Sequence, residues 1–569
     1  MEGEKSYLED STGSEEACGV RTTREPLSVE SRKNRGRQLD YLLERTGFGT
    51  YHVFLLVVCG VALASDSVEV SSVSFVTPVL DNNNNDTDRG GVHPTKFQSG
   101  ALDSIIFLGM MFGGYFWGSL ADIVGRRSCL VSSLIINGLF GLASSLSPNF
   151  AWFMVFRFGS GFGVGGSVPI VFSYFSEFFS SKYRNTLIIG LASFWTVGRL
   201  YASFVAWIVI PQTFSFHLGH MLVTSWRIFL ALCTLPSFLS ALAIVFMVES
   251  PGFLFYKGKA LKVRKVLNRV SSCQIRFTTH RPRSESTDGR EYDEIISSIS
   301  AADNSINNAL SVNRRDIGQK IKVVWSATVE LFKRSYVRPT VVMIIVNFTL
   351  SFGYYGLVLW FPEYFKYIEC HKNDNHNHSI ADVTDCGSNS DDNKIYLDNL
   401  YVSLATIPGI VFGLLSIKFL GSKVLLAISM VVSALSTFAI WGVPKEVDYI
   451  LLLSCIFTGF STIGWIALDV IIPELFPVHL RSTAFGMLSA IGRIGSIIGI
   501  LLFGRLITVS PYLPVLIVAA LLIFGGLAVF IIPEKRKLPV SRLCHCILTV
   551  IRNYCKRGPP LSSYERLND

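Results

Sequence analysis

About twelve apolar runs of membrane length recur along this 569-residue chain. A helix of roughly 20 residues crosses the ~30 Å hydrocarbon core of a bilayer, so each run predicts a spanning helix. Only 16% of the residues are charged, whereas a soluble domain carries about 25%. We therefore expect an all-α membrane protein that is embedded in a lipid bilayer. The runs centre on residues 51–80, 102–121, 128–147, 150–173, 186–210, 227–248, 339–361, 397–417, 423–442, 449–472, 482–503 and 511–532.

Basic residues gather in alternate loops, and this pattern predicts the orientation of the chain. Arg126 and Arg127 follow the second run, Lys182 and Arg184 follow the fourth, and further basic residues precede the first run and follow the last. With an even number of helices, both termini are expected in the cytoplasm. The net charge of +9 is then mainly a topology signal, and we expect no nucleic acid partner.

A long hydrophilic insert divides the runs into two sets of six. Its first part, Ala260–Val270, has basic and apolar residues at helical spacing, which fits either a helix on the cytoplasmic leaflet or a plain linker. The expected division is a cytoplasmic tail (1–50), a six-helix bundle (51–249), a cytoplasmic linker (250–338), a second six-helix bundle (339–533) and a cytoplasmic tail (534–569).

Two short segments repeat between these halves. Glu177–Arg184 (EFFSSKYR) returns as Glu474–Arg481 (ELFPVHLR), and Asp122–Arg127 (DIVGRR) aligns with Lys418–Lys423 (KFLGSK). The similar offset of both pairs predicts one six-helix unit repeated twice. The second copy has a lysine where the first has an acid, so the charge pattern is intact only in the N-terminal half.

The stretch Gly118–Arg127 (GSLADIVGRR) lies between the second and third runs. Its charges must lie at a water interface, because charge in hydrocarbon is costly. Its Gly118, Asp122, Gly125, Arg126 and Arg127 resemble the pattern between helices two and three of the major facilitator superfamily. This resemblance implies twelve transmembrane helices in two pseudo-symmetric six-helix bundles, which move solutes by alternating access.

Further segments along the helices are similar to the synaptic vesicle glycoprotein 2 family. They are Asp66–Val70, Ser167–Glu177, Ser225–Phe229, Ser351–Leu357 and Ala467–Val470. The resemblance implies a multi-pass glycoprotein of synaptic or secretory vesicles, and the plasma membrane is the alternative. Residues 362–396 are too few for the long lumenal domain of that family, and the related synaptic-vesicle-two-related protein also lacks this domain. We therefore expect a divergent, short-loop member.

Two acids in the first helix are the main candidates for a functional site. Asp66 and Glu69 are three residues apart and share one helix face. They could simply reach water near a helix end, but we favour binding of a proton or a cation, since burying acids in a membrane is costly. Arg199 in the fifth helix is expected to pair with one of them, because these helices are neighbours in the superfamily. Arg157 could simply snorkel to the interface.

The remaining candidates lie on helices five, seven, ten and eleven. Asp469 and Arg493 are expected to form a second buried pair, with either a functional or a purely stabilising role. Aromatic residues such as Tyr354 could line a cavity and stack on a cation or a ring, or pack at the membrane interface. The full predicted substrate- or proton-binding set is Asp66, Glu69, Trp195, Arg199, Tyr354, Trp465, Asp469 and Arg493.

A cytoplasmic gate follows from the repeated loop motifs. Family likeness implies that its charge contacts form in the outward-facing state and break in the inward-facing state. The predicted gate contains Gly118, Asp122, Gly125, Arg126, Arg127, Glu177, Arg184, Glu474 and Arg481.

These features favour secondary transport of a small organic solute, a sugar or an organic cation, with proton coupling. The chain has no phosphate-binding loop, and we expect no enzyme activity, cofactor or metal. The alternative is a vesicle glycoprotein that does not transport and that regulates exocytosis or trafficking through its cytoplasmic tails.

Three accessory features complete the expectations. Asn85 and Asn377 lie in sequons on the non-cytoplasmic side. Cys370 and Cys386 share an extracytoplasmic loop and are candidates for a disulfide. Tyr564 and Leu567 form a tyrosine-based sorting pattern that would bind a clathrin adaptor.

Overall fold

The computed structural model describes most of residues 38–80, 96–272, 325–372, 392–443 and 447–532, apart from a few positions within those ranges. The first half contains α2 (Thr50–Leu80), α3 (Lys96–Val124), α4 (Arg126–Ser145), α5 (Phe150–Ser176), α6 (Ser181–Ala192), α7 (Phe194–Val209), β1 (Ser215–Leu218), β2 (Met221–Thr224), α8 (Ser225–Cys233), α9 (Leu235–Val245), α10 (Pro251–Tyr256) and α11 (Ala260–Ser272). The second half contains α14 (Val337–Val358), α15 (Phe361–Lys372), α16 (Asp392–Leu404), α17 (Thr406–Leu420), α18 (Ser422–Gly442), α19 (Val447–Leu475), α20 (Val478–Leu506), α21 (Tyr512–Ala528) and the 3₁₀ turn η2 (Val529–Ile531).

Twelve helical segments among the described residues are long and apolar enough to cross a membrane. Their bounds lie within a few residues of those predicted from the apolar runs, so the predicted all-α membrane fold is confirmed. Three of the spans consist of two helices each. The α6–α7, α8–α9 and α16–α17 spans break at Ser193, Thr234 and Ala405.

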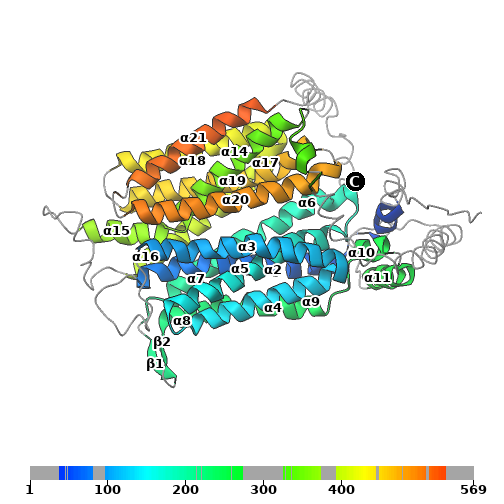
Figure 1. Ribbon diagram of the computed structural model, residues 1–569, viewed down its shortest axis with the longest axis horizontal. Coiled ribbons are helices and arrows are strands. Elements are labelled where there is room, and N and C mark those ends of the chain that lie inside the picture. The colour runs from blue at the N-terminus through cyan, green and yellow to red at the C-terminus, as the bar shows by residue number, and fades with distance from the viewer. Residues whose placement is uncertain are drawn as a thin grey trace, which may run out of the picture.

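The helices form two side-by-side groups (Figure 1). In the first half, α3 and α4 both pack on α5, while α2 packs on α7 and α9. In the second half, α14 packs on α20 and α21, and α18 packs on α19 and α21. The halves meet where α3 contacts α20, α7 contacts α16, and α2 contacts α15.

Opposite ends of the molecule carry different short elements. The β1–β2 hairpin and α15 lie at one end in Figure 1, which we call the hairpin end, and α10 and α11 lie at the other, the α11 end. The apolar runs alone did not predict the hairpin, which pairs Ser215–Leu218 with Met221–Thr224 in antiparallel register.

Contacts between the halves are found at the hairpin end. Lys366 on α15 donates to the carbonyl of Pro78, and the Tyr396 hydroxyl donates to the carbonyl of Phe75. Deeper in the molecule, the hydroxyls of Ser203 on α7 and Ser403 on α16 lie 2.8 Å apart. These bonds hold the two halves together on this side.

Helix α3 contacts the second half through its N-terminal part, near the hairpin end. Gly100 and Gly118 are 18 residues apart, which is five helical turns, so they lie on the same face of α3. A Cβ at Gly100 would lie 3.3 Å from the Ile500 carbonyl oxygen of α20, whereas a Cβ at Gly118 would meet no atom of the described residues within 4 Å. The buried apolar cluster of the first half near the α11 end also contains only residues between Leu39 and Val270. Among the described residues, the contact that Gly100 makes with α20 therefore has no counterpart at Gly118, on the same face of α3.

Helix α11 corresponds to the basic segment whose two interpretations the sequence left open. Val263, Val266, Leu267 and Val270 are buried in the same cluster as α2 and α10. The apolar face of α11 therefore packs on the first half of the protein and is not available for insertion into a leaflet. Its basic face stays exposed.

Candidate functional site

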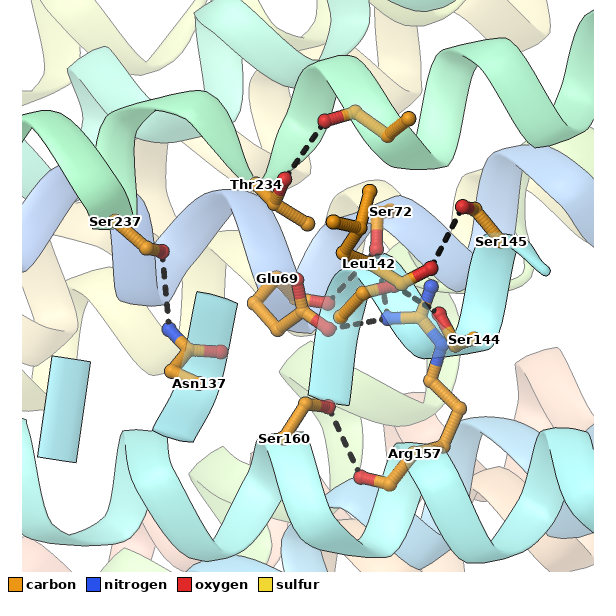
Figure 2. A network of polar contacts seen from close by, with 12 residues as sticks. Glu69, Ser72, Asn137, Leu142, Ser144, Ser145, Arg157, Ser160, Thr234 and Ser237 are labelled. Carbon is orange, nitrogen blue, oxygen red and sulfur yellow. Dashed lines mark hydrogen bonds and ion pairs between the residues drawn. The ribbon is translucent and has the colours of Figure 1, made fainter. Parts of the chain in front are cut away.

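Glu69 and Arg157 form an ion pair that is buried inside the first half. An Nη1 nitrogen of Arg157 on α5 lies 2.6 Å from a Glu69 carboxylate oxygen on α2, and both side chains are at most 2% exposed. The same nitrogen donates to the Ser72 hydroxyl at 3.2 Å. Figure 2 shows the arginine reaching from α5 to both residues. Arg157 therefore does not snorkel to the interface, and it is the partner of Glu69, which the sequence pattern did not predict.

Small residues around Glu69 make room for this pair. A Cβ added at Gly141 on α4 would lie 3.1 and 3.3 Å from the two carboxylate oxygens of Glu69. Nearby, Asn137 donates to the Ser237 hydroxyl of α9 at 3.3 Å (Figure 2). Helices α2, α4, α5 and α9 thus surround the carboxylate with polar and small side chains.

Two further buried acids lie close to this pair. One Asp66 oxygen accepts a 2.7 Å hydrogen bond from Ser167 on α5, and the other has no hydrogen-bond partner among the described residues. Asp103 on α3 is 2% exposed and interacts electrostatically with Arg157. It is a charge within an apolar run, so the argument that selected Asp66 could also have selected Asp103.

Arg199 does not pair with Asp66 or Glu69, which corrects the sequence-based expectation. Helices α2 and α7 are indeed packed together. However, Arg199 donates to the Tyr354 hydroxyl of the second half at 2.6 Å, and its guanidinium lies 5.7 Å from the centre of that ring. Since Glu69 is already paired with Arg157, Arg199 instead links the two halves.

The expected Asp469–Arg493 pair is also absent from the described residues, where no ion pair joins these two side chains. Arg493 on α20 hydrogen-bonds to Tyr355 and interacts electrostatically with Asp66. It also lies 5.8 Å from the centre of the Phe107 ring on α3. Asp469 is exposed on α19. The cation therefore faces an acid of the other half.

An aromatic cluster adjoins these arginines. Trp465 on α19 packs edge-to-face against both Tyr354 and Tyr355, with ring centres 6.1 Å apart in each case. Phe107 of the first half packs edge-to-face against Tyr355, with the two ring centres 4.9 Å apart. The Trp465 indole nitrogen is buried and has no hydrogen-bond partner in the described part of the chain. Trp195 is half-buried and packs against two buried apolar clusters, one that spans both halves and one that lies within the first half near the α11 end.

Helix termini at the α11 end are tied together by charged side chains. Glu249 accepts hydrogen bonds from the backbone amides of Arg127, near the start of α4, and Ser250, at 2.9 and 3.1 Å. Arg127 in turn donates to the carbonyls of Ile244 and Val245 at the end of α9. Anions stabilise helix N-termini and cations stabilise C-termini, so both contacts are favourable. We call Arg126, Arg127, Glu177 and Glu249 the capping network.

Glu177 completes the capping network. It lies 3.3 Å from Arg126 and accepts hydrogen bonds from the Ser250 hydroxyl and from the Phe253 amide at the start of α10. Burial raises the pKa of the Glu177 carboxyl, and the neighbouring Arg126 only partly opposes this. Arg184 instead contacts Asp40 at 3.3 Å.

The second half repeats part of this arrangement. Gly125 and Gly421 both have positive φ, at 129° and 79°, and each separates two helices. Lys423 donates to the carbonyls of Phe530 and Ile532, as Arg127 does at the end of α9. Ser422 stands at the position of Arg126 and donates to Glu474 at 2.7 Å. Ser422 and Lys423 thus make contacts equivalent to those of Arg126 and Arg127, but the positive charge of Arg126 is missing in the second half.

Several predicted residues lie outside the described part of the structure. The side chains of Asp122, Lys418, Arg481 and Cys370 are not described. The sequons at Asn85 and Asn377, Cys386, and the sorting pattern Tyr564 and Leu567 lie outside the described residues.

Comparisons with known proteins agree with this architecture. The model of the family described as "Sugar (and other) transporter" matches residues 52–542. Synaptic vesicle glycoprotein 2C of Mus musculus is 29% identical over 604 residues, covering 88% of this chain and 81% of that protein. Synaptic vesicle glycoprotein 2A of Homo sapiens is also 29% identical, with coverages of 89% and 80%.

Solved structures show the same fold. The xylose transporter XylE from E. coli, in a partially occluded inward-open conformation, matches with a TM-score of 0.60 at 14% identity, covering 85% of this chain and all of that one. A structure described as a major facilitator superfamily proton:xylose symporter matches with the same score at 15% identity. The protein is therefore a multi-pass membrane protein with the major facilitator fold, and it belongs to the sugar (and other) transporter family.

Proposed function

We propose that this protein is a proton-coupled secondary transporter that moves a sugar or an organic cation across a vesicle membrane. The two six-helix units, residues 51–249 and 339–533, would rock around a site between them. The observation that carries this proposal is the buried Glu69–Arg157 pair beside Asp66. Ionisable groups inside a membrane are costly and usually serve a function.

Asp66 is the proposed proton acceptor. One of its oxygens has no hydrogen-bond partner among the described residues, while Ser167 holds the other. Protonation of Asp66 would remove its attraction to Arg493 of the opposite half. The proton would thereby change an interaction between the two rocking bodies, which is what coupling to transport requires.

The aromatic cluster is the proposed solute site. Tyr354, Tyr355 and Trp465 offer ring faces and edges to a sugar ring or a cation. The buried Trp465 indole nitrogen could donate to a solute oxygen. The solute would then lie next to Arg199 and Arg493, where both halves contribute side chains.

Uptake into proteoliposomes tests this function. We would measure accumulation of labelled sugars and organic cations with and without an inward proton gradient, for wild type, Asp66→Asn and Glu69→Gln. Asp448→Asn is the matched control, because Asp448 is an exposed acid in the first turn of α19. We expect gradient-driven uptake in wild type and the control, and at least a tenfold loss in the two buried-acid variants. Uptake that both variants retain would reject the site.

The second candidate function is that of a vesicle glycoprotein that regulates trafficking and does not transport. Its support is the 29% identity to synaptic vesicle glycoproteins 2A and 2C and the loss of charge at Ser422. Under this proposal, both termini lie in the cytoplasm and the tail binds a clathrin adaptor through Tyr564 and Leu567. Absence of flux across a broad solute panel, together with mislocalisation of Tyr564→Ala in cells, would favour this candidate.

A further inference from the structure

A basic groove lies at the α11 end, outside the site described above. It has a volume of about 450 Å³. It lies between α11 and the C-terminal ends of α3 and α9. Its lining includes five cationic side chains: Arg127, Lys259, Lys262, Lys265 and Arg269. The four on and before α11 are exposed.

The charge of this groove is strongly one-sided. Glu249 is the single acid among the described residues that line it, and two backbone amides hold one of its carboxylate oxygens. The apolar face of α11 is already buried against the first half of the protein, so packing fixes which face of the helix is basic and exposed. Such an arrangement recognises a ligand with several negative charges, and phosphate groups meet this requirement.

Two exposed apolar side chains lie beside the groove at the ends of apolar spans: Val124, which lines it, and Phe246, which precedes the lining residue Met247. Val124, which lines the groove, is 53% exposed and follows the second span, which ends at Ala121. Phe246 is 69% exposed and directly follows the end of the sixth span at Val245. A soluble phosphate would not contact these apolar side chains. A lipid would place its headgroup among the cations and its acyl chains along Val124 and Phe246.

We propose that this groove binds the phosphorylated headgroup of an anionic membrane lipid, a phosphoinositide being the class with the charge it fits. The bound lipid would join α11 to the ends of α3 and α9, next to the capping network. This binding is independent of the transport function proposed above, because no residue of the buried ion pair or of the aromatic cluster lines the groove.

Binding to the purified full-length protein in detergent tests this site. The probes are short-chain phosphatidylinositol bisphosphate, short-chain phosphatidylcholine and free inositol trisphosphate. The variant is Lys262→Gln/Lys265→Gln. The matched control is Arg264→Gln, which removes an exposed cation from the same helix that does not line the groove.

We expect the bisphosphate lipid to bind wild type and Arg264→Gln alike. Because each basic residue near a lipid surface contributes about 1 kcal/mol, the double variant should bind about 30-fold more weakly. Binding to wild type should also weaken as salt rises, and this measurement does not depend on any variant folding. Equal loss in Arg264→Gln, or salt-independent binding, would overturn the site. Free inositol trisphosphate binding as tightly as the lipid would overturn the assignment to a lipid.

Discussion

The Arg157 guanidinium and the Glu69 carboxylate meet at 2.6 Å across helices α2 and α5, 88 positions apart in the chain, with both side chains almost fully buried. Removing one partner of a buried pair leaves an uncompensated charge, which is more costly than the loss of a surface contact. This difference makes the pair a natural target for a double-mutant cycle.

We expect Arg157→Gln and Glu69→Gln each to destabilise the protein by about 3–5 kcal/mol. The double variant should lose clearly less than the sum, because neither charge is then left alone. The half-buried Arg184–Asp40 pair, with side chains 35% and 39% exposed, is the control, and its loss should cost about 0–1 kcal/mol because solvent reaches both charges. Free energies of unfolding in detergent measure both cycles, and strict additivity at Arg157 and Glu69 would contradict the pairing.

Gly141 on α4 should be essential for the position of Glu69. In Gly141→Ala the new methyl group would crowd both carboxylate oxygens and lie 2.9 Å from the Thr234 side chain. We expect a loss of about 1–3 kcal/mol in stability and reduced solute uptake. Gly190→Ala is the control on α6, because its Cβ would meet no atom of the described residues within 4 Å. That change should be neutral or stabilising by roughly 0.5–1 kcal/mol. Equal effects of the two substitutions would show that the space around Glu69 is not limiting.

The Ser203–Ser403 contact offers a way to lock the two halves together. Its hydroxyl oxygens lie 2.8 Å apart and come from opposite halves, so cysteines at both positions should form a disulfide in the conformation described here. Oxidation of Ser203→Cys/Ser403→Cys should abolish uptake, and a reductant should restore it, while the single variants should be insensitive to oxidation. Normal uptake by the cross-linked protein would mean that α7 and α16 do not separate during transport.

The raised pKa of Glu177 predicts a specific pH dependence of stability. The folded state holds the Glu177 proton at pH values where the unfolded chain, with a carboxyl pKa near 4.5, has already released it. The free energy of unfolding therefore falls as the pH rises from the unfolded-state pKa of Glu177 through its raised folded-state pKa. Above the folded-state pKa, the destabilisation from the buried Glu177 carboxylate is complete. Melting temperatures between pH 4.5 and 8 should show wild type losing stability relative to Glu177→Gln as the pH increases.

Arg126→Gln provides the companion measurement for Glu177. Since Arg126 lowers the pKa of this carboxyl, its removal should shift the Glu177-dependent transition to higher pH. A transition that stays in place in Arg126→Gln would show that the 3.3 Å contact does not act on the Glu177 proton.

The sequence predicted those features that depend on local pattern. The apolar runs located all twelve spans to within a few residues, because membrane length and hydropathy are properties of a continuous segment. The repeated loop motif also anticipated Gly125 and Gly421 as equivalent turns, and both have positive φ. Even the selection of Asp66 and Glu69 as buried acids rested on a local argument, and both are almost fully buried.

The tertiary structure alone decided which charges meet. The sequence predicts that Arg199 and Arg493 pair with acids on neighbouring helices. In the structure they hydrogen-bond to Tyr354 and Tyr355. Arg157 forms the ion pair with Glu69. The sequence by itself determined that these charges must lie inside the membrane and need partners. It could not determine the partners, because pairing depends on how helices far apart in the chain rotate and pack against one another. The space at Gly141 likewise exists only once those helices are assembled.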